Sequence, residues 1–424
     1  MAVAATDIHR TIDAVWRIES PKLIAWLMRI VRDLALAEDL AQDALVAALE
    51  QWPESGVPDN PGAWLMATAK HRAIDFFRHN QLLVRKHEEL GRDVETRQME
   101  MPDFNANLDD RIGDDLLGLM FISCHPVLST EARTALTLRL LGGLKTDEIA
   151  RAFLLPEPTI AQRIVRAKRT LSDAHVPFEV PRGAELVARL SSVLEVIYLI
   201  FNEGYSATAG GDWMRPALCE DAIRLGRVLA ELAPREPEVH GLVALMEIQS
   251  SRAKARVGPT GEPILLFDQD RGKWDQLLIR RGLTALDRAE KLNAKRGPYT
   301  IQAAIAACHA RAHTPAETDW GRIVSLYDEL VEIAPSPVVQ LNRAVAVAMA
   351  SGPAAGFELT EKLRAESSLK NYHLLPSVRG DLLTKLGRLA EARAEFERAA
   401  TLTQNARERD LLLARAEKLA NRVD

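Results

Sequence analysis

Helical periodicity, interrupted by short segments that carry proline and glycine, runs along almost the whole of this 424-residue chain. Within residues 33–52, Leu36, Leu40, Ala44 and Ala47 recur along one stripe of a helix, and the segment "ESGVPDNPG" then supplies two prolines and two glycines. Runs of β-branched residues are short, whereas alanine, leucine and arginine, which favour helices, are abundant. The sequence therefore predicts an all-α fold.

The composition predicts a cytoplasmic protein with no membrane contact. Its hydrophobic fraction of 47% is enough to build two or three cores. The longest apolar stretch, "SVLEVIYLIF", contains Glu195 and is too short to span a bilayer. Cys124, Cys219 and Cys308 are odd in number and far apart, so we expect neither a disulfide framework nor a cysteine-based zinc site. No cofactor is expected.

Changes in composition divide the chain into four parts. Residues 1–84 form a first helical domain, and residues 85–115, which are polar and poor in aliphatic side chains, form an extended or disordered linker. Residues 116–176 form a second helical domain that ends at "HVPFEVPRG". Residues 184–424 form a long helical extension.

The end of the extension resembles a tetratricopeptide repeat, a helical hairpin in which small and large residues alternate in a fixed order. One unit earlier, Pro335 and Gly352 occupy the positions where such a repeat ends and turns. We therefore predict a stacked array of helical hairpins from about residue 275. The residues that carry the resemblance are Gly380, Leu383, Gly387, Leu389, Ala392, Phe396 and Ala399.

A helix-turn-helix is predicted in the second domain. The segment "LKTDEIARAFLL" reads as a short helix whose start is marked by the hydroxyl of Thr146 and by the acids Asp147 and Glu148. After a break at "LLPEP", the segment "EPTIAQRIVRAKRTL" forms a second helix that carries four bases. Four bases alone also fit a solvated cationic helix face, but the preceding helix and turn favour DNA binding. Gln162 and Arg163 would then read base edges, while Arg166, Lys168 and Arg169 would bind phosphates.

Charge is segregated along the first domain. Residues 35–59 contain six acids and no lysine or arginine, whereas residues 70–86 contain five bases and only Asp75 as an acid. An acidic helix followed by a basic one indicates that one face contacts a basic partner and another contacts nucleic acid.

These motifs together resemble a family, the extracytoplasmic-function sigma factors of bacterial RNA polymerase. "AEDLAQDALVAALEQW" is similar to their region 2.2, "NPGAWLMATAKHRAIDFFRHN" to regions 2.3 and 2.4, and "LKTDEIARAFLLPEPTIAQRIVRAKRTL" to region 4.2. The resemblance implies two small helical sigma domains, region 2 and region 4, and a protein that binds core RNA polymerase and promoter DNA.

The resemblance also implies roles for individual residues. Region 2.2 docks on the coiled coil of the polymerase β′ subunit through Asp39, Gln42 and Asp43, and region 4 contacts the β flap. The residues that the resemblance assigns to the −35 element are Thr159, Ala161, Gln162, Arg163, Arg166, Lys168 and Arg169. Those that it assigns to the −10 element are Asp59, Asn60, Trp64, Lys70, Arg72, Arg78 and Asn80.

Two of these features allow a second interpretation. Trp64 either lies along the unpaired DNA strand or is a core aromatic residue. Between Glu88 and Asp115 there are ten acids and three bases, so the linker either imitates a nucleic acid in a polymerase channel or is a solvated tether.

The extension looks like that of one group of these sigma factors, in which it regulates the factor in place of a separate anti-sigma protein. "FNEGYSATAGGDW" and "LLFDQDRGKWD" are its most distinctive segments, and the sequence leaves open whether they mask the DNA-binding helix or brace the sigma domains. We expect a regulatory surface at Asn202, Glu203, Asp268, Asp270 and Arg271. There are two alternatives. A divalent metal would bind among Glu262, Asp268, Asp270 and Asp275, or these acids would form salt bridges that anchor the loop.

The sequence thus predicts a non-enzymatic promoter-specificity subunit that is controlled by its own extension. The alternative is a repeat-based interaction or scaffold protein that retains a vestigial helix-turn-helix. Neither the promoter nor the inducing signal follows from the sequence.

Overall fold

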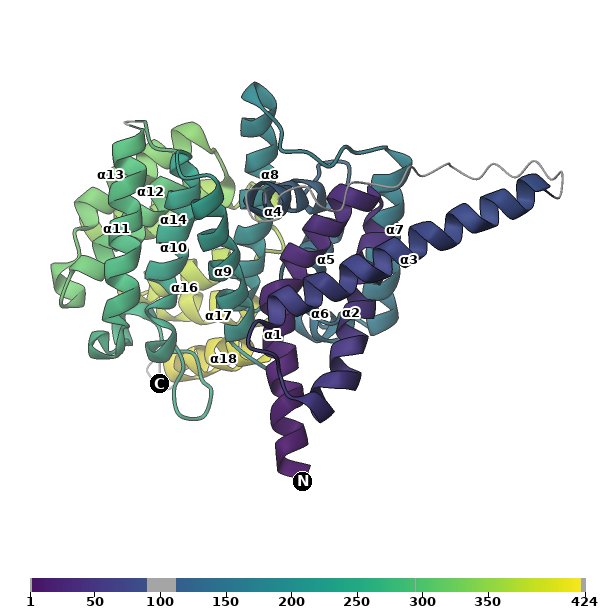
Figure 1. Cartoon of the computed structure of the whole chain (residues 1–424). Helices are drawn as coiled ribbons and strands as arrows, with labels where there is room; N and C mark the ends of the chain where they lie inside the picture. The colour runs from purple at the N-terminus through teal and green to yellow at the C-terminus, as the bar shows by residue number, and fades with distance from the viewer. Residues whose placement is uncertain (1, 90–111, 294, 421–424) are drawn as a thin grey trace. The chain divides into compact units, whose positions relative to one another are not determined.

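The computed structural model describes residues 2–89, 112–293 and 295–420, and these residues fold almost entirely into α-helices (Figure 1). The prediction of an all-α fold is therefore confirmed. Residues 90–111, which hold most of the predicted 85–115 linker, lie outside the described residues. No helix in the described part of the chain combines the length and the apolar character of a membrane span.

The chain divides into two compact units, Met1–Val196 and Ile197–Asp424. In the first unit, α1, α2, α3 and α4 each bury an aromatic side chain. These are Trp26, Trp52, Phe77 and Phe121, each at most 2% exposed. The helices of this unit are α1 (Ala2–Val31), α2 (Leu34–Ser55), α3 (Pro61–Glu89), α4 (Ile112–Ser123), α5 (Thr130–Leu140), α6 (Thr146–Phe153), α7 (Glu157–Asp173) and the first part of α8 (Gly183–Tyr205).

Local capping explains several of the helix starts. The Asp33 side chain accepts a hydrogen bond of 2.9 Å from the backbone N–H of Leu36, which fixes the start of α2. The predicted capping role of Thr146 was wrong, because Lys145 is the N-cap residue of α6 and Thr146 is already inside the helix. The Glu148 carboxylate accepts from the Lys145 backbone N–H at 2.8 Å instead. The Glu148 carboxylate, rather than the Thr146 hydroxyl, therefore accepts a hydrogen bond from a backbone N–H at the start of α6.

The second unit is a series of helical hairpins. Its elements are β1 (Ala209–Gly210), α9 (Pro216–Leu232), α10 (Pro237–Ser250), α11 (Gln276–Leu292), α12 (Pro298–Arg311), α13 (Trp320–Ile333), α14 (Pro337–Ser351), α15 (Pro353–Leu363), α16 (Leu374–Lys385), α17 (Leu389–Leu402), β2 (Gln404–Asn405) and α18 (Ala406–Ala420). Short 3₁₀ turns cover Ala253–Ala255, Leu266–Asp268, Arg271–Lys273, Pro315–Glu317 and Ser367–Leu369.

The predicted tetratricopeptide-like hairpin is confirmed in α16 and α17. A Cβ atom on Gly380 would lie 2.8 Å from the Phe396 ring, so only glycine lets the two helices approach this closely. Gly387, with φ +75°, forms the turn between the helices, and Gly352, with φ +96°, forms the turn between α14 and α15. Glycine therefore forms the turn at both predicted positions.

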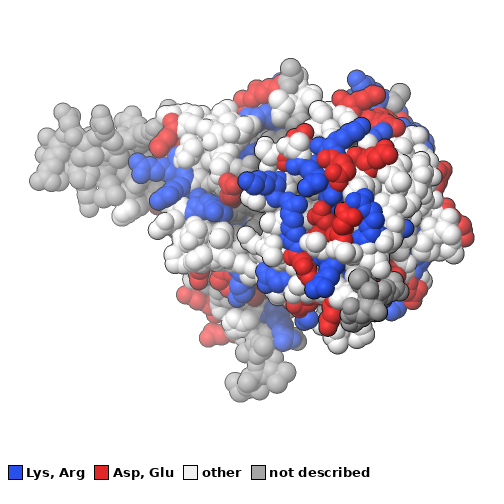
Figure 2. Space-filling model, turned by 180° about the vertical axis from the view of Figure 1, so that it is seen from behind, with Lys and Arg blue, Asp and Glu red and all other residues white. Residues whose placement is uncertain are grey.

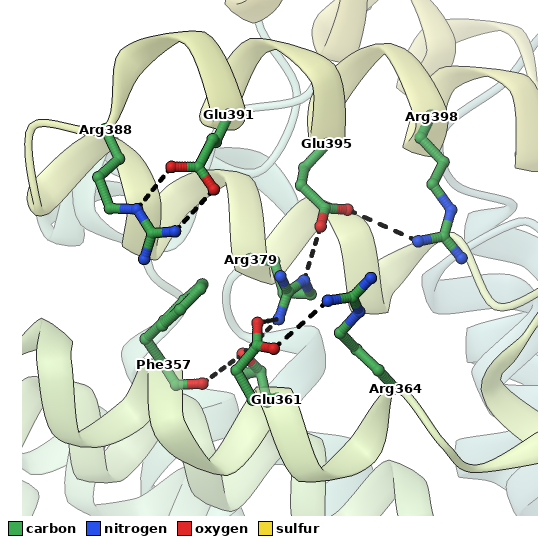
Figure 3. Close-up of polar contacts among 9 residues, drawn as sticks. Phe357, Glu361, Arg364, Arg379, Arg388, Glu391, Glu395 and Arg398 are labelled. Carbon is green, nitrogen blue, oxygen red and sulfur yellow. Dashed lines mark hydrogen bonds and ion pairs between the residues drawn. The ribbon is translucent and has the colours of Figure 1, made fainter.

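Ion pairs fasten the last hairpins together around Arg379 (Figure 3). This side chain, from α16, lies between Glu361 of α15 and Glu395 of α17, and its Nε donates to the Glu395 carboxylate at 2.7 Å. Arg388, directly before α17, forms a further pair with Glu391 of that helix. One buried guanidinium thus connects three successive helices.

Candidate nucleic-acid interface

The predicted helix-turn-helix is confirmed in α6 and α7. Leu154, directly after α6, adopts a left-handed conformation with φ +52°, and the chain re-enters a helix at Glu157. Ile149 of α6 packs in the core of this motif with Ile160 and Ile164 of α7, and all three are buried. Because these apolar residues recur at helical spacing, the opposite side of α7 is left for polar side chains.

Four of the predicted DNA-binding residues gather in one shallow hollow. Thr159, Gln162, Arg163 and Arg166 of α7 line it together with residues 127–129 and 132, and its volume is about 340 Å³. Thr159, Gln162 and Arg166 are exposed, whereas Arg163 is half-buried. The arrangement places hydrogen-bonding and cationic groups on one face of a helix, as major-groove reading requires.

The remaining basic residues of α7 differ from each other. The Arg169 side chain is 81% exposed and lies 3.5 Å from the Asp173 carboxylate one turn later. The Lys168 side chain is only 16% exposed, because its ammonium forms an ion pair with Glu38 of α2. Arg169 is therefore accessible to a phosphate, and Lys168 is held inside the first unit. Ala161 is half-buried.

Glu38 joins the two sequence-predicted sigma domains, and sequence reasoning missed it. Its carboxylate accepts from Arg139 Nε at 2.7 Å and from Gln42 Nε2 at 2.9 Å, besides its pair with Lys168. Burial raises the pKa of Glu38, but attraction by Lys168 and Arg139 outweighs burial and holds the pKa below its ordinary value. The carboxylate is therefore charged, and it fastens α2 to α5 and α7.

Two further ion pairs cross the same contact. Arg17 pairs with Glu148 at 2.8 Å and Lys145 pairs with Asp13 at 3.2 Å, and all four side chains are at least a quarter exposed. Exposed ion pairs contribute little stability because water screens them. A third pair joins Arg29 of α1 to Asp115 of α4, with the nearest atoms 3.5 Å apart. Glu38 differs from these pairs because it meets two cations at once.

The predicted polymerase-binding residues lie on the outer side of α2. Asp39 and Asp43 are exposed one turn apart, and Gln42 is half-buried beside Glu38. Val46 and Leu49 continue the same side and are 50% and 38% exposed. Sequence reasoning missed these two apolar residues. Their spacing could have revealed them, because residues three and six positions after Asp43 lie on the same side of the helix. Acids next to exposed aliphatic side chains suit a basic, amphipathic partner helix.

The predicted −10 residues are spread over the start and the body of α3. Asp59 is exposed, and the Asn60 side chain accepts from the Ala63 backbone N–H at 3.0 Å and so caps the helix. Trp64 is half-buried, and its ring meets the buried Trp52 ring edge-on at 5.3 Å. The ring of Trp64 therefore belongs partly to the core and partly to the surface.

Further along α3 the predicted residues do not share a single face. Arg72 and Arg78 are exposed, whereas Lys70 and Asn80 are half-buried. Because a helix completes a turn in 3.6 residues, Arg72, Arg78 and Asn80 point in three different directions. A single strand lying along α3 would therefore contact only some of them.

The predicted regulatory residues of the extension are mostly engaged in local structure. Glu203 forms an ion pair with Arg215 and accepts from the Thr208 hydroxyl at 2.9 Å. The Asp270 carboxylate accepts from the Gly272 backbone N–H at 2.9 Å. Arg271 donates to the backbone carbonyls of His309 and Ala312, at 2.7 and 2.6 Å, where α12 ends.

Asn202 is exposed on α8, and Asp268 lines a hollow of about 510 Å³ beside α16, α17 and α18. Among the side chains that the structure describes, no group of three or more His, Cys, Asp and Glu is placed to hold a metal ion. On the face of the molecule drawn in Figure 2, basic and acidic side chains alternate over short distances.

Comparison with protein families gives three matches. Sigma-70 region 2 matches residues 16–82, and sigma-70 region 4 matches residues 119–171. A family of unknown function (DUF6596) matches residues 189–290, which begin within α8.

Among the known proteins similar to this chain is a relative that matches nearly its whole length. Uncharacterized protein R00370 of Rhizobium meliloti is 43% identical over 401 residues, which are 94% of each chain. The ECF RNA polymerase sigma factor SigC of Mycobacterium tuberculosis is 29% identical over 39% of this chain and 78% of its own length. The RNA polymerase sigma-H factor of Pseudomonas aeruginosa is 26% identical over 37% of this chain and 81% of its own length.

Proposed function

The chain belongs to the same family as the Rhizobium meliloti protein and is a sigma factor of the extracytoplasmic-function type with a helical C-terminal extension, and on this premise we propose that its extension controls promoter-specific transcription. Sigma-70 regions interact with RNA polymerase and promoter DNA in general. The proposal concerns which surfaces of this chain make each contact and what the extension does.

Helix α7 recognises the −35 element in the major groove. The observation that carries this proposal is the hollow on α7, where Gln162, Arg163 and Arg166 lie together on one side of the helix. Arginine and glutamine are the side chains that pair with guanine and adenine edges. Arg169, exposed at the end of the helix, contacts a phosphate, and Lys168 joins it only after its ion pair with Glu38 breaks.

The outer side of α2 docks on the β′ coiled coil of core polymerase. Asp39 and Asp43 supply the charge, and the exposed Val46 and Leu49 supply apolar contact area. Region 4 contacts the β flap at the same time. Each contact uses a different surface, so a substitution on α2 and one on α7 have separable effects.

The loop before α3 borders the flipped base of the −10 element through Asp59 and Asn60. The exposed part of Trp64 lies next to this loop and provides a surface on which an unpaired base stacks. Binding the unpaired strand offsets the cost of unstacking it.

The extension contacts the sigma domains and is required for activity. Helix α8 supports this proposal, because it begins in the first unit and ends in the second without a break. Its Ser192 hydroxyl donates to the Cys124 carbonyl at 2.6 Å, and Arg189 donates to the Phe121 carbonyl at 3.0 Å. The extension therefore begins on a helix that is anchored to region 4.

Transcription from a cognate promoter with purified core polymerase tests the proposed function. A sigma factor directs initiation at that promoter and gives no transcript from a promoter with altered −35 and −10 elements. A scaffold protein with a vestigial helix-turn-helix binds its partners without directing transcription from either template, and that result would reject the proposal.

A further inference from the structure

Arg256 is a buried cation with no carboxylate partner among the described residues. Its side chain follows the 3₁₀ turn after α10 and is only 7% exposed. The other two buried arginines of the described chain are paired, Arg189 with Glu185 and Arg379 with Glu361 and Glu395. Burial lowers the pKa of Arg256, as expected for a charge whose hydration is not replaced by an anion.

The groups around Arg256 are hydrogen-bond donors that lack acceptors. The Arg256 guanidinium carbon lies 3.6 Å from the centre of the Tyr205 ring and 5.6 Å from that of the Trp213 ring. The Tyr205 hydroxyl and the Trp213 indole N–H are both buried without a hydrogen-bond partner. Among the described residues, the guanidinium has one hydrogen-bond acceptor: the Tyr205 backbone carbonyl accepts from Arg256 Nη1. The guanidinium thus has two ring faces as cation–π partners but no anion, and two buried donors without a hydrogen-bond partner belong to the same rings.

The nearby charges do not neutralise Arg256. Glu203, two residues before Tyr205 on α8, is already paired with Arg215. Arg252, one turn before Arg256, lowers the pKa of Arg256 further, and it donates to Gln249 and Gln269 rather than to an acid. Arg252 therefore adds a second positive charge near Arg256, and among the described residues no carboxylate pairs with Arg256.

The loop that carries Trp213 is held by hydrogen bonds to the last hairpin of the extension. Loop 206–215 carries Trp213, and its strand β1 pairs in parallel with β2 of the last hairpin. The buried Asn405 side chain donates to the carbonyls of Ala207 and Asp212 at 2.9 and 2.8 Å. The loop is thus built from hydrogen bonds that hold Trp213 in place, and the cluster is organised before any ligand arrives.

We propose that Arg256, Tyr205 and Trp213 bind the anionic group of a small ligand, a carboxylate or a phosphate. The guanidinium provides the charge and a planar pair of N–H donors, which match the oxygens of either group. The Tyr205 hydroxyl and the Trp213 N–H donate to the same oxygens. Because loop 206–215 is also tied to β2, an occupied site strengthens the link between the first and the last hairpin of the extension.

Thermal unfolding of the full-length protein tests this site with two probes, inorganic phosphate and succinate, against sodium chloride at equal ionic strength. We expect saturable stabilisation by at least one probe, and the probe that saturates at the lower concentration identifies the preferred anionic group. Stabilisation by both probes no greater than that by chloride overturns the proposal, since buried water then accounts for the orphan donors.

Substitutions that keep the rings make the test specific. Tyr205→Phe and Trp213→Phe each remove one orphan donor, so the unliganded melting temperature should stay close to that of the wild type. The apparent dissociation constant of the probe should rise about tenfold in each, because a hydrogen bond to a charged group is lost. Arg281→Met, at an exposed position of α11, is the control and should leave the constant unchanged. An unchanged constant in both ring-preserving variants overturns the assignment.

Discussion

At the level of single residues, Glu38 has the largest influence on how the sigma domains are held. Its carboxylate is 3% exposed and meets two cations that come from positions 139 and 168 in the sequence. Burying one carboxylate with two cations is favourable only while all three are present, because each charge has lost its hydration. The consequences can be measured by removing the negative charge alone.

Glu38→Gln keeps the shape of the side chain and leaves Arg139 and Lys168 without their shared anion. We expect the free energy of unfolding to fall by about 3 kcal/mol, as measured by urea denaturation. Asp39→Asn, an exposed neighbour on the same helix, should change it by no more than about 0.5 kcal/mol. Equal effects of the two substitutions would show that the buried ion pairs do not stabilise the first unit.

The pH dependence of this effect has a definite sign. The folded pKa of Glu38 lies below its ordinary value of 4.5, so its stabilisation is present above that value and is lost as the pH falls through the folded pKa. The difference in unfolding free energy between wild type and Glu38→Gln should therefore be full at about pH 7 and smaller at about pH 3.5. A difference that grows on acidification would contradict the lowered pKa.

At the level of elements, α2 and α7 present different chemistry to different partners. The outer side of α2 carries Asp39 and Asp43 with exposed aliphatic side chains, while α7 carries Gln162, Arg163 and Arg166 in its hollow. Each helix buries its other side in the first unit. Because the two exposed surfaces share no residues, polymerase binding and promoter reading should fail independently.

Asp39→Arg combined with Asp43→Arg places positive charge where a basic partner docks. We expect the affinity for core polymerase to fall at least about tenfold through like-charge repulsion. Arg163→Ala, on the other helix, should leave that affinity unchanged. Binding of labelled sigma factor to purified core measures both, and equal losses would defeat the assignment of α2.

Arg163 and Arg169 should affect promoter recognition in different ways. Arg163 lines the hollow on α7, so Arg163→Ala should cost about 1–3 kcal/mol at one promoter position and relax specificity there. Arg169 is exposed at the helix end, so Arg169→Ala should weaken binding evenly and lower the salt slope by about one unit. Promoter-library profiling compares the variants, and identical profiles position by position would rule out this division.

At the level of the whole molecule, α8 begins in the first unit and ends in the second. A chain stopped after Val196 keeps the anchoring contacts of Arg189 and Ser192 and removes the second unit. We expect promoter-dependent transcription to fall about tenfold, within the usual range of coupling between sites. Core binding and circular dichroism, measured on the same sample, report whether the remaining unit is folded.

The control for truncation is an insertion that keeps both units. A short Gly-Ser segment placed after Val196 breaks the continuous helix without removing any residue of the extension. If the extension acts through α8, this variant should also lose transcription. Full activity of both the truncated and the inserted chain would show that the extension is a passive or separately used module.

The sequence by itself determined where the helices lie, because periodicity, caps and glycine turns are local and act within one or two turns of the chain. It predicted the helix-turn-helix and the hairpin at Gly380 and Phe396 for this reason. Its error at Thr146 was a choice between neighbouring capping groups.

The tertiary structure alone decided which charges meet and which remain unpaired. Glu38 looks like any other acid of an amphipathic helix, and its cations lie 101 and 130 positions away. Arg256 looks like any other arginine, and only the packed structure shows that it is buried and that no carboxylate pairs with it among the described residues. Many helix packings satisfy the same local patterns, so the partner of a buried charge is fixed only when the helices have packed.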